Sequence, residues 1–187
     1  FSGASNFNGD ISGWNVSNVE VFHGMFWEAS SFNQDISAWD VSSAYEFGRM
    51  FKEATSFDQP IGAWNMGNAV SIAMMFDSAL VFNQDLTNWD VSRIETMYAT
   101  FRDASNYSSP LHDWNVSNVE DMSFMFHKAT SFNHPLDSWD VSKVYDMSDM
   151  FSHMNFNQDI GNWLVANVNR MDYMFVENQA FDQDLSN

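Results

Sequence analysis

The chain contains no cysteine and few basic residues. Without cysteine it has no disulfide framework, no thiolate nucleophile and no thiol zinc site, and the usual redox clue to its compartment is missing. Seven Lys and Arg stand against 25 Asp and Glu, which gives a formal net charge of -18. Because no basic run exists that could follow a phosphate backbone or an anionic bilayer, we expect neither nucleic acid nor anionic lipid as a partner.

Long apolar runs are also missing, so we expect no direct membrane insertion by this segment. The first residues, Phe1 to Ala4, include no initiator Met and no basic or apolar signal region. Apolar residues nevertheless make up 45% of the 187 residues, and aromatic residues 17%. That content is enough to bury a continuous core, so the chain is expected to fold.

Aromatic residues recur at a fixed interval of 25 residues, shortened once to 24, which is the mark of a tandem repeat. Two further aromatic series, beginning at Phe1 and Phe7, keep the same interval. The missing residue lies between Phe151 and Phe156, which predicts a deletion in that loop. We predict that the repeating tryptophans form the structural core; they are Trp14, Trp39, Trp64, Trp89, Trp114, Trp139 and Trp163.

Within each period the pattern predicts a strand, a helix and a return loop. Ile11, Trp14 and Val16 have the L-x-x-L-x-L spacing of a leucine-rich-repeat strand. An S-x-x-E capping box then indicates a helix start, as in the pairs Ser17/Glu20, Ser92/Glu95 and Ser117/Glu120. The apolar stripe of that helix has three- and four-residue steps, at Val19, Phe22, Met25, Phe26 and Ala29.

These patterns predict an α/β solenoid of leucine-rich-repeat type, with one short parallel strand and one short helix per 25-residue repeat. In its loops, Asn33 and Gln34 are expected to hydrogen-bond backbone between neighbouring coils. Residues 1–187 would be a single array of about seven and a half repeats, and we expect it to be an excerpt of a longer array without its caps.

One recurring string runs Phe-Asn-Gln-Asp-Ile/Leu-Ser-x-Trp-Asp-Val-Ser, and Phe32 to Val41 and Phe82 to Val91 match it nearly letter for letter. This string resembles the repeat of BspA-like surface proteins. The resemblance implies a leucine-rich-repeat-like solenoid displayed on the cell surface, with adhesion and binding to a host or matrix as its function.

The residue after each tryptophan is predicted to point outward and to form a column that serves as an interaction surface. It alternates between amide and acid, in the order Asn15, Asp40, Asn65, Asp90, Asn115 and Asp140. Stacked all-Asp positions would repel one another, so the alternation favours a maintained surface over a calcium site, which requires about six to eight converging oxygens. A second column, broken by Pro60, Pro110 and Pro135, is interpreted as loop capping; it contains Asp35, Asp85, Asp159 and Asp184.

Candidate catalytic chemistry is sparse in the sequence. The five histidines fall at scattered repeat positions without a recurring carboxylate or serine partner, so we predict no enzyme, no catalytic residue, no metal site and no cofactor, with calcium as the one alternative. They are His23, His112, His127, His134 and His153. Three sequons, at Asn15, Asn106 and Asn115, are candidate glycosylation sites of a secreted glycoprotein.

The functional hypothesis is an extracellular or cell-surface structural or adhesion protein. It would present a repetitive acidic surface to a protein, to a glycan or to copies of itself, including homo-oligomers or a filament. The alternative is a ligand-binding repeat module of a cell-surface receptor. The stretch from Asn106 to His112, in which Tyr107 replaces Phe, is the most deviant loop and the candidate place for such a pocket.

Overall fold

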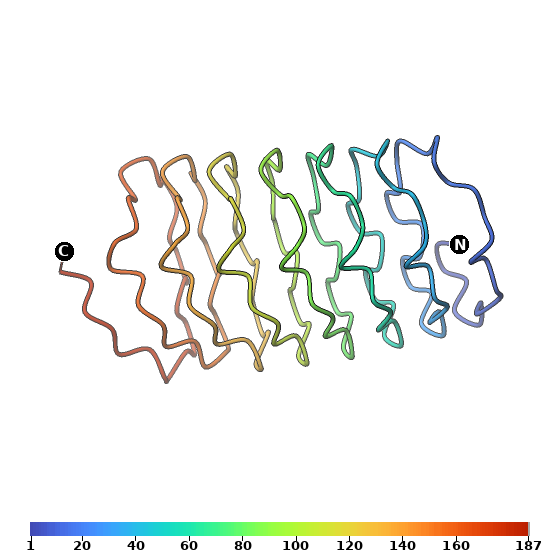
Figure 1. Cartoon of the computed structure of the whole chain (residues 1–187). Coiled ribbons are helices and arrows are strands. Elements are labelled where there is room, and N and C mark those ends of the chain that lie inside the picture. Colours follow the sequence, from blue (N-terminus) through green and yellow to red (C-terminus); the bar gives the residue numbers. More distant parts are fainter. Residues whose placement is uncertain (187) are drawn as a thin grey trace.

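A computed structural model describes residues 1–186, which form a row of stacked coils with the two ends of the chain at opposite ends of the row (Figure 1). Within these residues there is no helix, and strand pairing is confined to isolated parallel bridges. The bridges connect the same position of successive coils, at Val21, Glu46, Ser71, Thr96, Asp121, Asp146 and Arg170. This spacing confirms the 25-residue period and its single shortening to 24. No helix that could cross a bilayer occurs in the described part of the chain.

The predicted strand from Ile11 to Val16 is wrong, because two tight turns occupy this segment. The Trp14 N–H donates to the Ile11 carbonyl (3.1 Å), and the Val19 N–H donates to the Val16 carbonyl (2.8 Å). The Asp10 carboxylate accepts the backbone N–H of Ser12 (2.9 Å), which is the Asx turn that Asp and Asn favour. The D-x-S spacing therefore bends the chain where the apolar pattern predicts an extended strand.

The predicted helix is also wrong. The N–H groups of Phe22 and Phe26 donate to carbonyls of the next coil, Glu46 (2.8 Å) and Met50 (2.9 Å), so they are not used in the i to i-4 bonds of an α-helix. Residues Gly24 and Glu28 have φ angles of 61° and 59°, in the left-handed region that a right-handed helix excludes. Consecutive turns place apolar side chains inward at intervals of three and four residues, and this spacing imitates helical periodicity.

The predicted S-x-x-E capping box has a different role in the structure. The Ser17 N–H and hydroxyl both bond to Oδ1 of Asn15, at 3.1 Å and 2.8 Å, so the serine closes an Asx turn. With neither the strand nor the helix present, the α/β class and the leucine-rich-repeat assignment are both overturned. The fold is a solenoid built from turns, in which backbone bonds between coils replace regular secondary structure.

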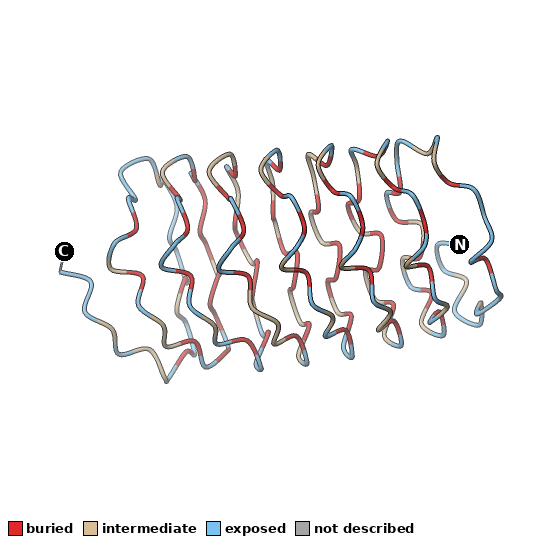
Figure 2. Cartoon of the chain, in the orientation of Figure 1, coloured by how far each residue is buried: buried red, intermediate tan, exposed pale blue. Residues whose placement is uncertain are grey.

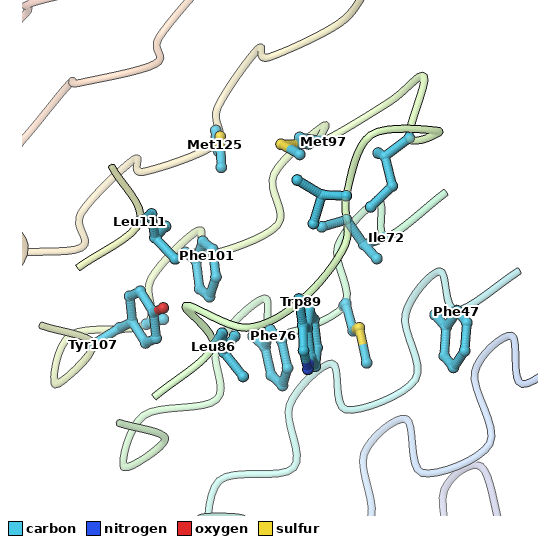
Figure 3. Packing of buried hydrophobic residues seen from close by; sticks show 14 of the residues in the cluster. Phe47, Ile72, Phe76, Leu86, Trp89, Met97, Phe101, Tyr107, Leu111 and Met125 are labelled. Carbon is cyan, nitrogen blue, oxygen red and sulfur yellow. The ribbon is translucent and has the colours of Figure 1, made fainter. Parts of the chain in front are cut away.

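Aromatic rings fill the inside of the coils. Phe51 lies 5.6 Å from Phe26 and 5.8 Å from Phe76 between ring centroids, and within its own coil it lies 3.9 Å from Phe57. Stacked aromatic pairs add to the free energy gained by burial alone. Figure 3 shows this packing around Phe76 and Phe101, and Figure 2 shows buried segments recurring from coil to coil along the row. Each coil therefore depends on its neighbours for its core.

The tryptophans tie each coil to the preceding one. The Trp89 indole Nε1 donates to the Ile61 carbonyl at 3.0 Å, and the other buried tryptophans make the equivalent bond. Trp39 to Trp163 are at most 8% exposed. The prediction that Trp14 belongs to the core is wrong, because its side chain is 50% exposed and no described coil covers it on that side.

The shortened repeat lies where the sequence predicts it. Phe151 and Phe156 still stack, with ring centroids 4.0 Å apart, and Met154 fills the position of the usual alanine at 2% exposure. Asn157 continues the loop contacts of its neighbours, with its N–H donating to Oδ1 of Asn133 (2.9 Å). The deletion is absorbed in the loop and the core register is preserved.

Candidate interaction surface

The six residues predicted as the outward column all lie exposed on the surface. Each accepts a hydrogen bond from the backbone N–H two residues later, as Asp40 does from Ser42 (3.1 Å) and Asn65 does from Gly67 (3.1 Å). The remaining members, Asn15, Asp90, Asn115 and Asp140, make the same bond. The column is a row of Asx turns, and its hydrogen bonds stay within each coil.

The second acidic column has the same construction. Asp35 caps Ser37, Asp85 caps Thr87, and Asp159 and Asp184 accept from the residues two positions later, all at 2.8 to 3.0 Å. Hydrogen bonds from Ser37 and Ser42 lower the pKa of Asp35 and of Asp40, because they stabilise the ionised carboxylate. Within residues 1–186 no three His, Asp or Glu side chains gather in a way that could hold a metal ion.

The loop prediction is confirmed for Asn33, which bonds backbone of the next coil, whereas Gln34 bonds to a side chain of the preceding coil. Oδ1 of Asn33 accepts the Asp58 N–H of the next coil at 3.0 Å, and Nε2 of Gln34 donates to Oδ1 of Asn8 in the preceding coil at 3.0 Å. The same contacts recur along the array. This column is therefore the polar link between coils.

A buried ion cluster is the feature that sequence reasoning missed. Asp77 is 0% exposed and lies between Lys52, whose Nζ is 2.7 Å away, and Arg102, which donates two bonds at 2.6 and 3.0 Å. The three residues are 25 apart and belong to three successive coils. Opposite charges at whole-period spacing are the signal that could have revealed the cluster.

The histidines are scattered over the surface, but two of them have partners that the sequence did not reveal. His127 Nδ1 is 2.6 Å from the Ser152 hydroxyl, which itself donates to the Asp149 carbonyl (2.8 Å). The imidazole is therefore the donor in this pair, and burial lowers the pKa of His127. Ser152 is fully buried. Because it lies 25 residues after His127, the contact links two successive coils. The His134 ring bonds to the Ser108 carbonyl (2.6 Å).

The remaining three histidines and the sequons lie on the surface. His23 lies 3.6 Å from Glu46, and His112 lies 3.2 Å from Asp113. His153 meets the edge of the His127 ring, with centroids 5.3 Å apart. The sequon asparagines Asn15, Asn106 and Asn115 are all exposed.

The deviant loop from Asn106 to His112 directs its aromatic residue inward. Tyr107 is fully buried and stacks between Phe82 and Phe132, with ring centroids 6.1 and 6.2 Å apart. Figure 3 shows its ring inside the coil. The substitution of Tyr for Phe thus changes the core of this coil.

A polar groove of about 350 Å³ lies elsewhere, across the middle coils. It contains both basic and acidic side chains, which the two Asx columns do not. Its lining residues are Val70, Arg93, Glu95, Asn118, Glu120 and Lys143.

The turn-built coils, the aromatic core and the exposed polar columns define the class of this protein as a tandem-repeat solenoid. A family model described as "Mycoplasma protein of unknown function, DUF285" matches residues 1–89 and residues 70–187, and the chain belongs to this family. Comparison with curated proteins and with solved structures gave no match.

Proposed function

We propose that this chain is a structural or adhesion scaffold that presents its repeated acidic surface to a protein, to a glycan or to copies of itself. The supporting observation is the exposed Asx column, in which acid and amide alternate over six coils on a backbone fixed by local turns. Regular spacing of identical groups suits multivalent binding, because many weak contacts add up through effective concentration.

We further propose that the protein acts at the cell surface. Support comes from the resemblance of the repeat, from Phe32 to Val41 and from Phe82 to Val91, to BspA-like surface proteins. Antibody labelling of intact and of permeabilised cells that carry the native protein checks the location. Equal labelling of both is the expected result, and labelling that requires permeabilisation would contradict it.

The multivalent hypothesis is tested with two probes, a second copy of the chain and an array of immobilised glycans. Asp40→Ala, Asp90→Ala and Asp140→Ala are made singly and together. We expect each single variant to weaken binding slightly and the triple variant to weaken it strongly. Loss of all binding from one substitution would overturn the distributed surface, as would failure of the native chain to bind either probe.

A ligand-binding receptor module is the second candidate function. The polar groove supports it, because Arg93 and Lys143 stand where other coils have uncharged residues such as Asn68 and Asn118. The two candidates make opposite predictions. In the receptor module a single substitution in the groove abolishes binding, and substitutions in the Asx column leave it unchanged.

A further inference from the structure

Arg93 and Lys143 are unusual among the basic residues of this acidic chain. Arg93 donates to Oδ1 of Asn68 (2.8 Å), and Lys143 donates to Oδ1 of Asn118 (2.5 Å), in each case on the preceding coil. Within the described residues neither cation has a carboxylate within 4.0 Å, whereas Lys52, Arg102, Lys128 and Arg170 each do. Arg49 also has none, but its guanidinium lies over the Trp27 ring, 5.7 Å from the ring centroid. The two side chains are exposed and belong to one groove. Two positive charges therefore remain available to an anionic ligand.

The backbone beside these cations is held by hydrogen bonds between successive coils. The N–H of Glu95 donates to the Val70 carbonyl (2.9 Å), that of Glu120 to the Glu95 carbonyl (2.8 Å), and that of Tyr145 to the Glu120 carbonyl (2.8 Å). This ladder fixes one side chain per coil, so the glutamates stand in neighbouring coils about 5 Å apart. Tyr145, next in the row, is 43% exposed. The backbone beneath the groove is therefore preorganised, which lowers the entropic cost of binding.

The mixture of charges selects the chemistry of the ligand. Arg93 and Lys143 lie two coils apart, about 10 Å, and each can bond a carboxylate. Glu95 and Glu120 lie in the same groove and accept hydrogen bonds, so they suit hydroxyl donors and repel a densely charged polyanion. Tyr145 lies outside the groove lining but follows Glu120 in the same row, where its partly exposed aromatic side chain can pack against a pyranose.

We infer that this groove binds a carboxylated saccharide, with its carboxylates at Arg93 and Lys143 and its hydroxyls at Glu95 and Glu120. The inference rests on the second candidate function, the ligand-binding module, and names the ligand class of its groove. A neutral saccharide leaves both cations without a carboxylate. An acidic peptide offers carboxylates and backbone N–H donors, so it is the competing ligand that the test includes.

The test is calorimetric titration of the chain with a glucuronate-containing tetrasaccharide. The matched ligand is the same tetrasaccharide with its carboxylates reduced to hydroxymethyl groups, and a poly-glutamate peptide is the third probe. We expect binding of the first ligand only. Arg93→Gln and Lys143→Gln should each weaken it about tenfold, and Lys128→Gln, a cation with an exposed side chain outside the groove, should leave it unchanged.

Three results would overturn the inference: no binding of the glucuronate ligand, equal binding of the reduced ligand or the peptide, or equal loss in Lys128→Gln. Thermal unfolding of each variant checks that the fold is intact. The triple substitution at Asp40, Asp90 and Asp140 separates this inference from the broader proposal. If self-association or binding of other glycans responds to the triple variant while the glucuronate ligand never binds, the groove inference fails and the scaffold stands.

Discussion

Tyr107 is the one tyrosine in the second aromatic series, where the neighbouring coils have Phe82 and Phe132. Its hydroxyl is buried and has no hydrogen-bond partner among residues 1–186, and burial raises the pKa of this phenol well above its usual value. Leaving a buried polar group unsatisfied costs about 1 to 3 kcal/mol. The ring itself packs like the phenylalanines above and below it.

We therefore predict that Tyr107→Phe stabilises the fold by about 1 kcal/mol. Urea unfolding followed by tryptophan fluorescence measures the change. Tyr145→Phe is the control, because that hydroxyl belongs to a side chain that is 43% exposed and its removal should be neutral. A loss of stability in Tyr107→Phe would mean that the hydroxyl has a partner.

Asp77 is a polar residue at which a single substitution should be strongly destabilising. Replacing it with Ala leaves Lys52 and Arg102 facing each other without the carboxylate, and breaking a buried ion pair costs about 3 to 5 kcal/mol. Asp103→Ala provides the comparison, because Asp103 pairs with Lys128 at 3.8 Å across a half-exposed contact. Such surface pairs contribute about 0 to 1 kcal/mol.

Both substitutions are measured by chemical denaturation at neutral pH. We expect Asp77→Ala to lower the free energy of unfolding several times more than Asp103→Ala does. Equal effects would show that the buried cluster contributes no more than a surface pair.

Among the turns, the one after Ile61 has the least room. A Cβ on Gly62 would lie 2.2 Å from the Asp85 carbonyl oxygen of the next coil, which forces the two coils apart. We predict that Gly62→Ala destabilises the protein by about 1 to 3 kcal/mol. Gly13→Ala, where nothing lies within 4 Å of the added carbon, is the control and should be neutral in a thermal melt. Equal melting temperatures would refute the close approach.

The Asx turns make a prediction about acid. Hydrogen bonds from Ser42, Ser92 and Ser142 hold the pKa of Asp40, Asp90 and Asp140 below the ordinary value of 3.8. Because the pKa is lower in the folded state than in the unfolded state, this stabilisation is fully present above pH 3.8 and is lost as pH falls through the lowered values. Protonation removes the charge that strengthens each cap.

Asn65 and Asn115 form the same Asx turn with an amide side chain, which does not titrate. We therefore predict that the triple variant Asp40→Asn, Asp90→Asn, Asp140→Asn loses less stability between pH 5 and about pH 3 than the native chain does. Urea midpoints across this range measure the difference. Parallel pH profiles for the two proteins would show that the caps do not titrate as described.

The turns also explain which parts of the fold the sequence could predict. Four features depend on the spacing between coils, which can be read directly from the sequence. They are the period, the aromatic core, the position of the deletion and the contacts of Asn33 and Gln34 between coils. The strand and the helix were predicted wrongly because apolar spacing reports which side chains face inward and leaves open where the N–H groups bond. Phe22 and Phe26 face inward at helical spacing, yet their N–H groups bond to the next coil.

The same distinction separates the parts of the candidate interaction surface that could be predicted from the sequence from the parts that could not. The exposed columns could be placed from the period, since every member repeats. The groove could not, because its two cations are recognised by their asparagine partners 25 residues away and by the lack of a carboxylate within 4.0 Å in the described structure. A charged residue at a repeat position that is uncharged in the other coils is the sequence signal for such a site.

The molecule as a whole is held together only by contacts between successive coils, so its stability should vary along its length. The N–H of Phe76 donates to the Thr100 carbonyl and that of Phe101 to the Met125 carbonyl, both at 2.9 Å. Phe175, the equivalent residue of the last described coil, has no following coil within residues 1–186. Figure 2 shows that coil as largely exposed.

For a polypeptide of residues 1–187 alone, we predict that amide hydrogen exchange is slowest in the middle coils, around Phe76 to Phe126, and at least tenfold faster in residues 169–186. Mass spectrometry of peptides from exchanged samples measures it, and the central coils serve as the internal reference. Uniform protection along the chain would instead indicate all-or-none unfolding.

The indole bond of each buried tryptophan has a further consequence, at the level of the gene. Trp89 reaches Ile61 and Trp114 reaches Leu86, both across 28 residues, so any two neighbouring coils meet through the same contacts. Misaligned recombination that adds or removes 25 codons therefore yields a chain whose new junction already fits. One exception is the coil that contains Asp77, because its excision would bring Lys52 against Arg102 without the carboxylate that now lies between them.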